Sequence, residues 1–132
     1  MNDKIKKRLV EAVNKLEGAK TCLKFIHWNA PSLTEHRLCD DVHKELSEFQ
    51  DNVAEIFQVI VNERLTLKDM NPQYPSVNTL YDFLIVVCDD CQEDAAILRA
   101  QNDLDLIGII SEYEGFVAKL QKFIYQCSLL LK

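Results

Sequence analysis

Five ionisable side chains recur between Ser32 and Arg64 at spacings typical of one face of an α-helix. They are His36, Asp40, His43, Asp51 and Glu55. At about 100° per residue, all five lie well away from the apolar stripe of the same helix. A face of this kind is most often solvated. Histidine and carboxylate are also ligands that iron, manganese and zinc accept, so a solvated face and a metal site are the two alternatives.

Two pairs within this stripe have the i, i+4 spacing that lets side chains converge on one ion. His36 and Asp40 form the first pair, and Asp51 and Glu55 form the second. About three helical turns, roughly 16 Å, separate the pairs, which is too far for a single ion within one chain. A site that uses both pairs therefore needs a second copy of this helix running antiparallel. We expect a two-fold dimer in which His36 of one copy lies near Asp51 or Glu55 of the other.

His27 is a further candidate ligand, near the end of the preceding helical segment. It falls at nearly the same helical angle as Leu9, Val13 and Leu16, on or beside the buried stripe. Its position is consistent with a hydrogen-bonded core histidine and with a metal ligand, and the residues alone do not choose between them.

Four helical segments have to position these residues, because apolar residues recur at steps of three and four along the chain. Asp3 is the expected N-cap of the first segment, which ends near Pro31. The sequence Ser32-Leu33-Thr34-Glu35 has the pattern of a capping box and opens the second segment. The region 64–75 holds two of the three prolines and predicts a loop with at most one short turn.

The second half of the chain predicts two more helices separated by a short break at 101–103. Ser76 is the expected cap of the third helix. The stripe of the fourth helix is expected to consist of Leu106, Ile110, Tyr113, Val117, Leu120, Ile124, Cys127 and Leu131. Gly108 and Gly115 mark places where a neighbouring element could approach this helix closely. The predicted fold is all-α, a single antiparallel four-helix bundle domain over residues 1–132.

Composition and charge restrict the function classes. The 132 residues are 48% apolar and 27% charged with a net charge of −6, which is typical of a compact folded domain. Proteins that bind nucleic acid through phosphate contacts are normally basic, so nucleic acid is not the expected partner. No apolar run approaches the roughly 20 residues of a membrane span, and the start lacks a secretory signal, so a membrane is not an expected partner either.

The five cysteines are odd in number and stand within apolar patterns, which predicts reduced thiols in the cytoplasm. Cys88 and Cys91 have the CxxC spacing, but they lie inside a helical stripe with no strand before them. We therefore expect Cys91 to pack in the core and Cys88 to be partly exposed.

Taken together, these residues resemble the ferroxidase signature of the mini-ferritins called Dps proteins. The resemblance covers roughly residues 20–60 and is carried by His27-Trp28-Asn29, the His36/Asp40 pair and the Asp51/Glu55 pair. The spacing of the last four residues follows the family pattern residue for residue. A second pattern, Asp103-Leu104-Asp105-Leu106-Ile107, resembles small ferritin-like proteins of phages and large viruses.

The resemblance implies a ferritin-like fold, a homo-oligomer and oxidation of Fe(II) at a site between subunits. His27, His36 and Asp40 would hold one ion, and Asp51 and Glu55 of a second copy would bind or bridge another. Zinc or manganese could substitute for iron. The alternative function is a helical structural or interaction module, in the cytoplasm or in a virion, that has the fold without the chemistry.

Overall fold

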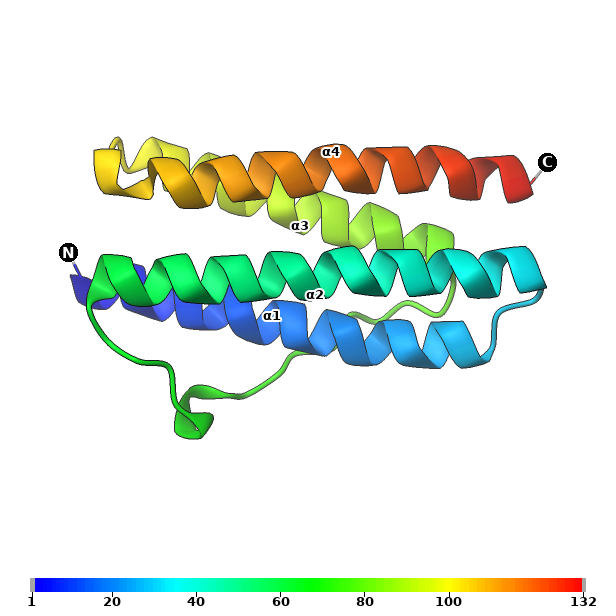
Figure 1. Cartoon of the computed structure of the whole chain (residues 1–132), viewed down its shortest axis with the longest axis horizontal. Coiled ribbons are helices and arrows are strands. Elements are labelled where there is room, and N and C mark those ends of the chain that lie inside the picture. The colour runs from blue at the N-terminus through cyan, green and yellow to red at the C-terminus, as the bar shows by residue number, and fades with distance from the viewer. Residues whose placement is uncertain (1, 132) are drawn as a thin grey trace.

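The computed structural model describes residues 2–131 and is helical apart from its connections (Figure 1). The long helices are α1 (Asn2–Trp28), α2 (Leu33–Val61), α3 (Leu80–Ala100) and α4 (Ile107–Leu130). Two short 3-10 helices are η1 (Leu67–Asp69) and η2 (Leu104–Leu106). Residues 2–131 contain no strand, which confirms the all-α prediction. None of the helices in this range has both the length and the apolar character needed to cross a bilayer.

The four long helices lie side by side, and each packs mainly on two others. α1 contacts α2 and α3, and α4 contacts the same two helices. In Figure 1, α1 and α4 run from left to right, while α2 and α3 run from right to left. The connection between α2 and α3 (residues 62–79, the crossover segment) therefore travels the length of the helices, whereas the other two connections are short.

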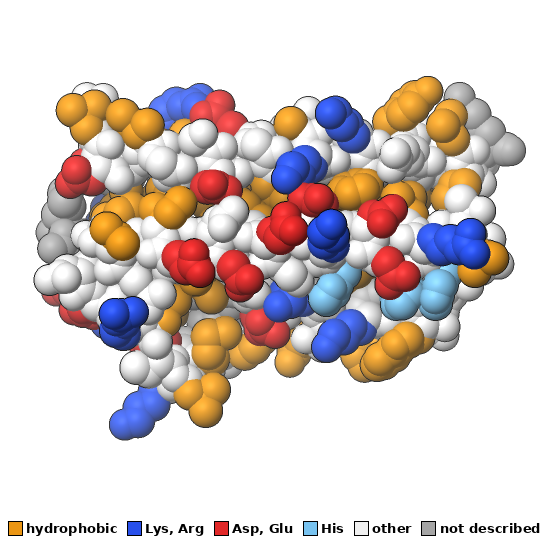
Figure 2. All heavy atoms as spheres, in the orientation of Figure 1, with side chains coloured by type: hydrophobic (Ala, Val, Ile, Leu, Met, Phe, Trp, Pro, Cys, Tyr) orange, Lys and Arg blue, Asp and Glu red, His pale blue; other side chains and the backbone are white. Residues whose placement is uncertain are grey.

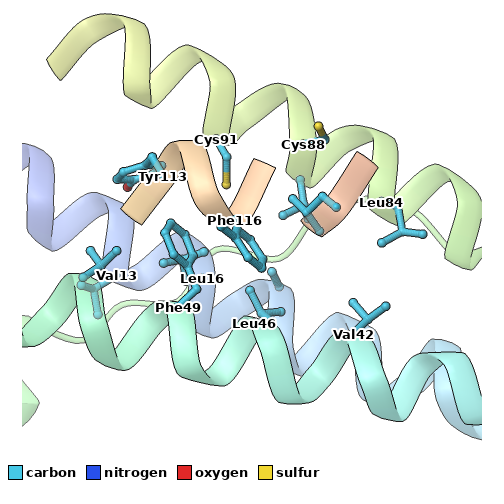
Figure 3. Close-up of a cluster of buried hydrophobic side chains, with 14 of the residues drawn as sticks. Val13, Leu16, Val42, Leu46, Phe49, Leu84, Cys88, Cys91, Tyr113 and Phe116 are labelled. Atoms are coloured by element: carbon cyan, nitrogen blue, oxygen red, sulfur yellow. The ribbon is translucent and has the colours of Figure 1, made fainter. Parts of the chain in front are cut away.

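One continuous core fills the space between the helices (Figure 3). Its centre is aromatic: the ring of Phe49 stacks on Phe116 with centroids 4.2 Å apart and meets Tyr113 edge-on at 5.0 Å. Figure 3 shows Leu16 and Cys91 beside these rings, so α1 and α3 also contribute to the centre of the core. The apolar residues along one face of α3 are all buried: Leu80, Leu84, Val87, Cys91, Ala95 and Leu98.

The buried face of α4 differs from the predicted stripe. Ile109 and Phe116 are buried, while their neighbours Ile110 and Val117 are only half-buried. Leu131, predicted at the end of the stripe, is 65% exposed. Adjacent apolar positions produce two overlapping stripes, and periodicity alone does not say which one faces the core.

The caps confirm one of the three predicted helix starts. Ser32 caps α2, because its Oγ accepts a hydrogen bond from the Glu35 N–H at 3.2 Å. Asp3 lies inside the first turn of α1 rather than before it, so that N-cap prediction was wrong. Ser76 does not cap α3 either. Thr79 does, accepting from the Asp82 N–H at 3.2 Å, because residues 76–78 lie outside the helix, which begins only at Leu80.

The crossover segment is fixed to one stripe of α1, at positions 14, 18 and 22. Asn14 donates from Nδ2 to the Asp69 carbonyl at 2.9 Å and accepts from the Asn71 N–H at 2.6 Å. Two turns later, the Cys22 thiol donates to the carbonyls of Pro75 and Val77 at 3.7 and 3.5 Å. The prediction of a loop with one short turn is confirmed by η1, but the sequence did not show that this loop is held against α1.

Gly18, between Asn14 and Cys22, allows the closest approach. A Cβ atom at this position would lie 1.8 Å from the carbonyl oxygen of Gln73. The predicted close approach at Gly108 and Gly115 was wrong, because no heavy atom lies within 4 Å of a Cβ built at either. These two glycines face open space on α4.

Candidate metal centre

The turn between α1 and α2 positions the candidate ligands. Residues 29–32 reverse the chain, and Pro31 and the Ser32 cap fix where α2 begins. The last turn of α1 therefore lies against the first turns of α2. His27 comes from the end of α1, and His36 and Asp40 come from the start of α2.

Three candidate residues meet at this junction. The Nε2 atoms of His27 and His36 are 2.9 Å apart, and His27 Nε2 lies 3.2 Å from Asp40 Oδ1. The ligand atoms of these three residues all lie within 4.8 Å of one another. Both histidines are half-buried, while the Asp40 side chain is 62% exposed. His27 thus belongs to a polar cluster and is not enclosed in the hydrophobic core.

A backbone carbonyl sets the tautomer of His36. Its Nδ1 lies 3.1 Å from the carbonyl oxygen of His27. A carbonyl can only accept, so Nδ1 carries the proton and the lone pair of neutral His36 is on Nε2. His27 Nε2 faces two groups that can accept a proton, His36 Nε2 at 2.9 Å and Asp40 Oδ1 at 3.2 Å. Histidine ligands of metals are commonly oriented in this way, by a carbonyl that accepts from the second ring nitrogen.

Two of the three separations in the cluster are those expected of ligands around one metal ion. Two ligands bound at about 2.1 Å and at right angles to each other are about 3.0 Å apart. The separations of 2.9 and 3.2 Å from His27 Nε2 are close to this value, while His36 and Asp40 are farther apart, within 4.8 Å. Two histidines and one carboxylate form the donor set of non-haem iron sites with open positions, and zinc accepts the same set. Binding would require the proton on His27 Nε2 to leave or to move to Nδ1.

Asp51 and Glu55 do not join this cluster within the chain. Both are exposed on α2, beyond Ser47, and the metal-ligand cluster found in residues 2–131 contains neither. This agrees with the separation expected from the helical rise. Their contribution from a second copy stays a prediction.

His43 is the residue whose placement the sequence did not reveal. The polar stripe placed it away from the core, yet it is half-buried, and its Nε2 is enclosed. The seven-residue spacing of His36 and His43 puts them only about 20° apart around α2, on the same face of the helix. This spacing was the one feature of the sequence that indicated a shared environment for the two histidines.

The exposed face of α2 has mixed charges in its first half and only acidic charges in its second half. Arg37, Lys44, Asp40 and Asp41 lie in the first half, and Glu48, Asp51 and Glu55 lie in the second. Figure 2 shows the histidine side chains together in the right half of this face, with acidic side chains continuing to the left. The four charges of the first half therefore cancel, while the second half is acidic.

The cysteines take no part in this centre. All five are free and buried, so the expectation of a partly exposed Cys88 was wrong: it is 5% exposed. Burial raises the pKa of Cys39 to about 12 and also raises the pKa of Cys91. Thiols held in the protonated form are poor nucleophiles and poor metal ligands.

No family model, curated protein or solved structure matches this chain.

Proposed function

We propose that this protein is a ferritin-like four-helix bundle that binds Fe(II) as its substrate and oxidises it at a site between two copies. The observation that carries the proposal is the meeting of His27, His36 and Asp40, in which His27 Nε2 lies at 2.9 and 3.2 Å from the other two groups, distances close to those between ligands of one ion. The cluster is assembled without an ion, so binding would require only local changes of the side chains.

The arrangement of the helices supports the ferritin-like part of the proposal. Neighbouring helices α1 and α2 run in opposite directions, as do α3 and α4. A single long connection joins the two pairs end to end. Ferritin-like bundles have one such long crossover among otherwise short connections.

The charges on α2 support an antiparallel pair as the complete site. In that arrangement, Arg37 and Lys44 of one copy lie near the acidic half of the other, while Asp40 lies opposite Asp51 and needs a cation between them. The same symmetry takes Asp51 and Glu55 of the second copy toward the cluster of the first. The half-buried Ser47 near the centre is small enough for the two helices to approach closely.

The side chains of the site would promote oxidation mainly by binding the iron and lowering its reduction potential. Carboxylate oxygens are hard ligands and stabilise ferric over ferrous iron, so they lower the reduction potential and favour electron transfer to peroxide or O₂. Asp40 supplies such an oxygen from the same chain as the histidines, and Asp51 and Glu55 would supply others. His27 releases or relocates its Nε2 proton as it becomes a ligand.

An interaction module without metal chemistry is the second candidate, favoured by exposed apolar side chains near the cluster. Phe25, Trp28 and Leu33 at the α1–α2 turn are each more than half exposed, as are Tyr125 and Leu131 on and just after α4. Exposed apolar groups gathered in one region commonly mark a protein interface. Such a module would have the same fold in the cytoplasm or in a virion.

The double variant Asp51→Asn/Glu55→Gln tests the proposal. We expect the rate of Fe(II) oxidation to fall at least tenfold, because the carboxylates of the second copy are lost. The rate is measured from the ferric absorbance that appears after peroxide or O₂ is added. Helicity should not change, because both side chains are exposed and keep their volume.

The matched control is Asp89→Asn/Glu93→Gln, which removes an exposed pair of the same types and spacing from α3. It should oxidise Fe(II) like the wild type. Wild-type rates in the α2 variant would contradict the inter-subunit site, and a wild-type protein that neither binds nor oxidises Fe(II) would favour the interaction module.

A further inference from the structure

His43 has a polar atom that the fold leaves unpaired. It lies three residues after Asp40 on α2, and its Nε2 is buried without a hydrogen-bond partner among the described residues. Buried polar atoms in folded proteins nearly always have a partner, because an unpaired one lowers stability. An exception beside a candidate metal centre points to a partner that is not part of the polypeptide.

A cavity of about 330 Å³ adjoins the candidate centre and is lined in part by His43. His27 and Asp40, two of the three candidate ligands, line the same cavity, together with Lys24. The cavity has room for water molecules next to the ligand atoms. Because Nε2 is enclosed in the present position of the ring, it would reach a water molecule in this cavity only after the ring rotates about its Cβ–Cγ bond.

The groups around His43 keep its imidazole neutral. Burial lowers its pKa most, and the positive charges of Lys20 and Lys24 on α1 lower it further, while Asp40 raises it. Lys20 is held by Gln50 Oε1 at 3.0 Å, so Lys24 is the cation that shares the cavity. A neutral imidazole can accept a hydrogen bond from a water molecule.

We infer that His43 is a positioning residue of the metal centre, which holds a water molecule on an open coordination position of an ion bound by His27, His36 and Asp40. It is not a direct ligand, because it stands outside the cluster whose atoms lie within 4.8 Å of one another. This inference rests on the proposed metal binding. By accepting from the water, His43 strengthens its bond to the ion, as groups around metal ligands commonly do.

The variants His43→Leu and His43→Gln test this role, with Co(II) as the probe and without any oxidation step. The dissociation constant for Co(II) is measured by absorption titration, and the melting temperature is measured without metal. We expect His43→Leu to weaken Co(II) binding by about 10- to 100-fold. Its metal-free melting temperature should equal or exceed that of the wild type, because an unpaired buried nitrogen is removed.

His43→Gln is the matched control, since its amide can still hydrogen-bond the water. It should bind Co(II) within about threefold of the wild type. Wild-type affinity in His43→Leu would overturn the inference and leave the proposed function standing. Equal losses of affinity in both variants, with lower melting temperatures, would show a packing role and also overturn it. A wild-type protein that does not bind Co(II) would contradict both proposals.

Discussion

The close approach of His27 and His36 is the feature on which the proposed metal binding depends. The two Nε2 atoms lie 2.9 Å apart, and the His27 carbonyl fixes the tautomer of His36. If an ion binds here, two metal–nitrogen bonds would replace this contact, and His27 would give up its Nε2 proton. The two histidines are already side by side, which would reduce the entropic cost of assembling the site.

Asp40→Asn tests the cluster itself. The side chain is 62% exposed and the amide oxygen can still accept from His27, so helicity and melting temperature should stay within error of the wild type. The negative charge and the hard anionic ligand are lost. We expect Zn(II) or anaerobic Fe(II) binding, measured by calorimetry, to weaken at least tenfold.

Asp41→Asn is the neighbouring control, with the same change of charge at an exposed position outside the cluster. It should bind the metal within about twofold of the wild type. Equal losses in both variants would mean that general electrostatics, rather than ligation by Asp40, accounts for the effect.

Sequence reasoning identified the candidate ligands but not how His27 and His43 are placed. His36 and Asp40 share one helix, so their spacing is enough to place them together. The position of His27 depends on the angle at which α1 and α2 meet, and this angle is set by packing along both helices. The burial of His43 depends on the same packing. Neither property is contained in the periodicity of a single segment.

At the scale of the elements, α1 has two roles: one stripe faces the core, and another anchors the crossover segment. Asn14, Gly18 and Cys22 are spaced by four residues along this second stripe. The Asn14 amide and the Cys22 thiol form hydrogen bonds with the crossover segment, and the absence of a side chain at Gly18 lets its backbone approach closely. The four predicted helices agree with the structure because each has a long apolar stripe. The anchoring of the crossover was not predictable, because polar and glycine residues at this spacing carry no distinctive pattern.

Gly18→Ala measures the close approach of the crossover segment to α1. Alanine is a better helix former than glycine by about 1 kcal/mol. Here, however, its Cβ would collide with the backbone of Gln73, which is not a flexible side chain that can turn away. We expect a net loss of about 1–3 kcal/mol in the free energy of unfolding, measured by urea denaturation.

Gly115→Ala provides the opposite result within the same chain. Nothing lies within 4 Å of its added Cβ, so only the helix propensity changes. The free energy of unfolding should rise by about 0.5–1 kcal/mol. If both substitutions stabilise the protein, the crossover segment does not lie against α1 as described.

At the scale of the whole molecule, the charges of α2 determine the expected assembly. The second half of its exposed face carries Glu48, Asp51 and Glu55, and no Lys or Arg lies in this half of the helix. Pairing would bring Arg37 and Lys44 of the other copy near these charges, but Asp40 and Asp41 lie in the same half, so a cation at each end of the pair would have to compensate the repulsion between carboxylates.

Arg37→Glu/Lys44→Glu should weaken this pairing. The four-unit change in charge makes both halves of the face acidic, so two copies repel each other. We expect the sedimentation coefficient to shift from that of a dimer to that of a monomer at low salt, and metal to restore the dimer only partly. Lys119 is unsuitable as a control because it pairs with Glu45 at 2.8 Å.

The control is Lys122→Glu/Arg64→Glu, which applies the same change in charge at exposed positions of α4 and of the crossover segment. Its sedimentation should match that of the wild type. A wild-type protein that is monomeric with and without metal would contradict pairing through α2.

The position of the cluster in the chain has a consequence for the order of events during synthesis. His27, His36 and Asp40 all belong to the hairpin formed by α1 and α2, which is complete by residue 61. The contact of Gly18 with Gln73 spans 55 residues and closes later, because long loops form more slowly than short ones. We expect a nascent chain that has released only its first hairpin from the ribosome to be able to capture a metal ion before α3 and α4 exist.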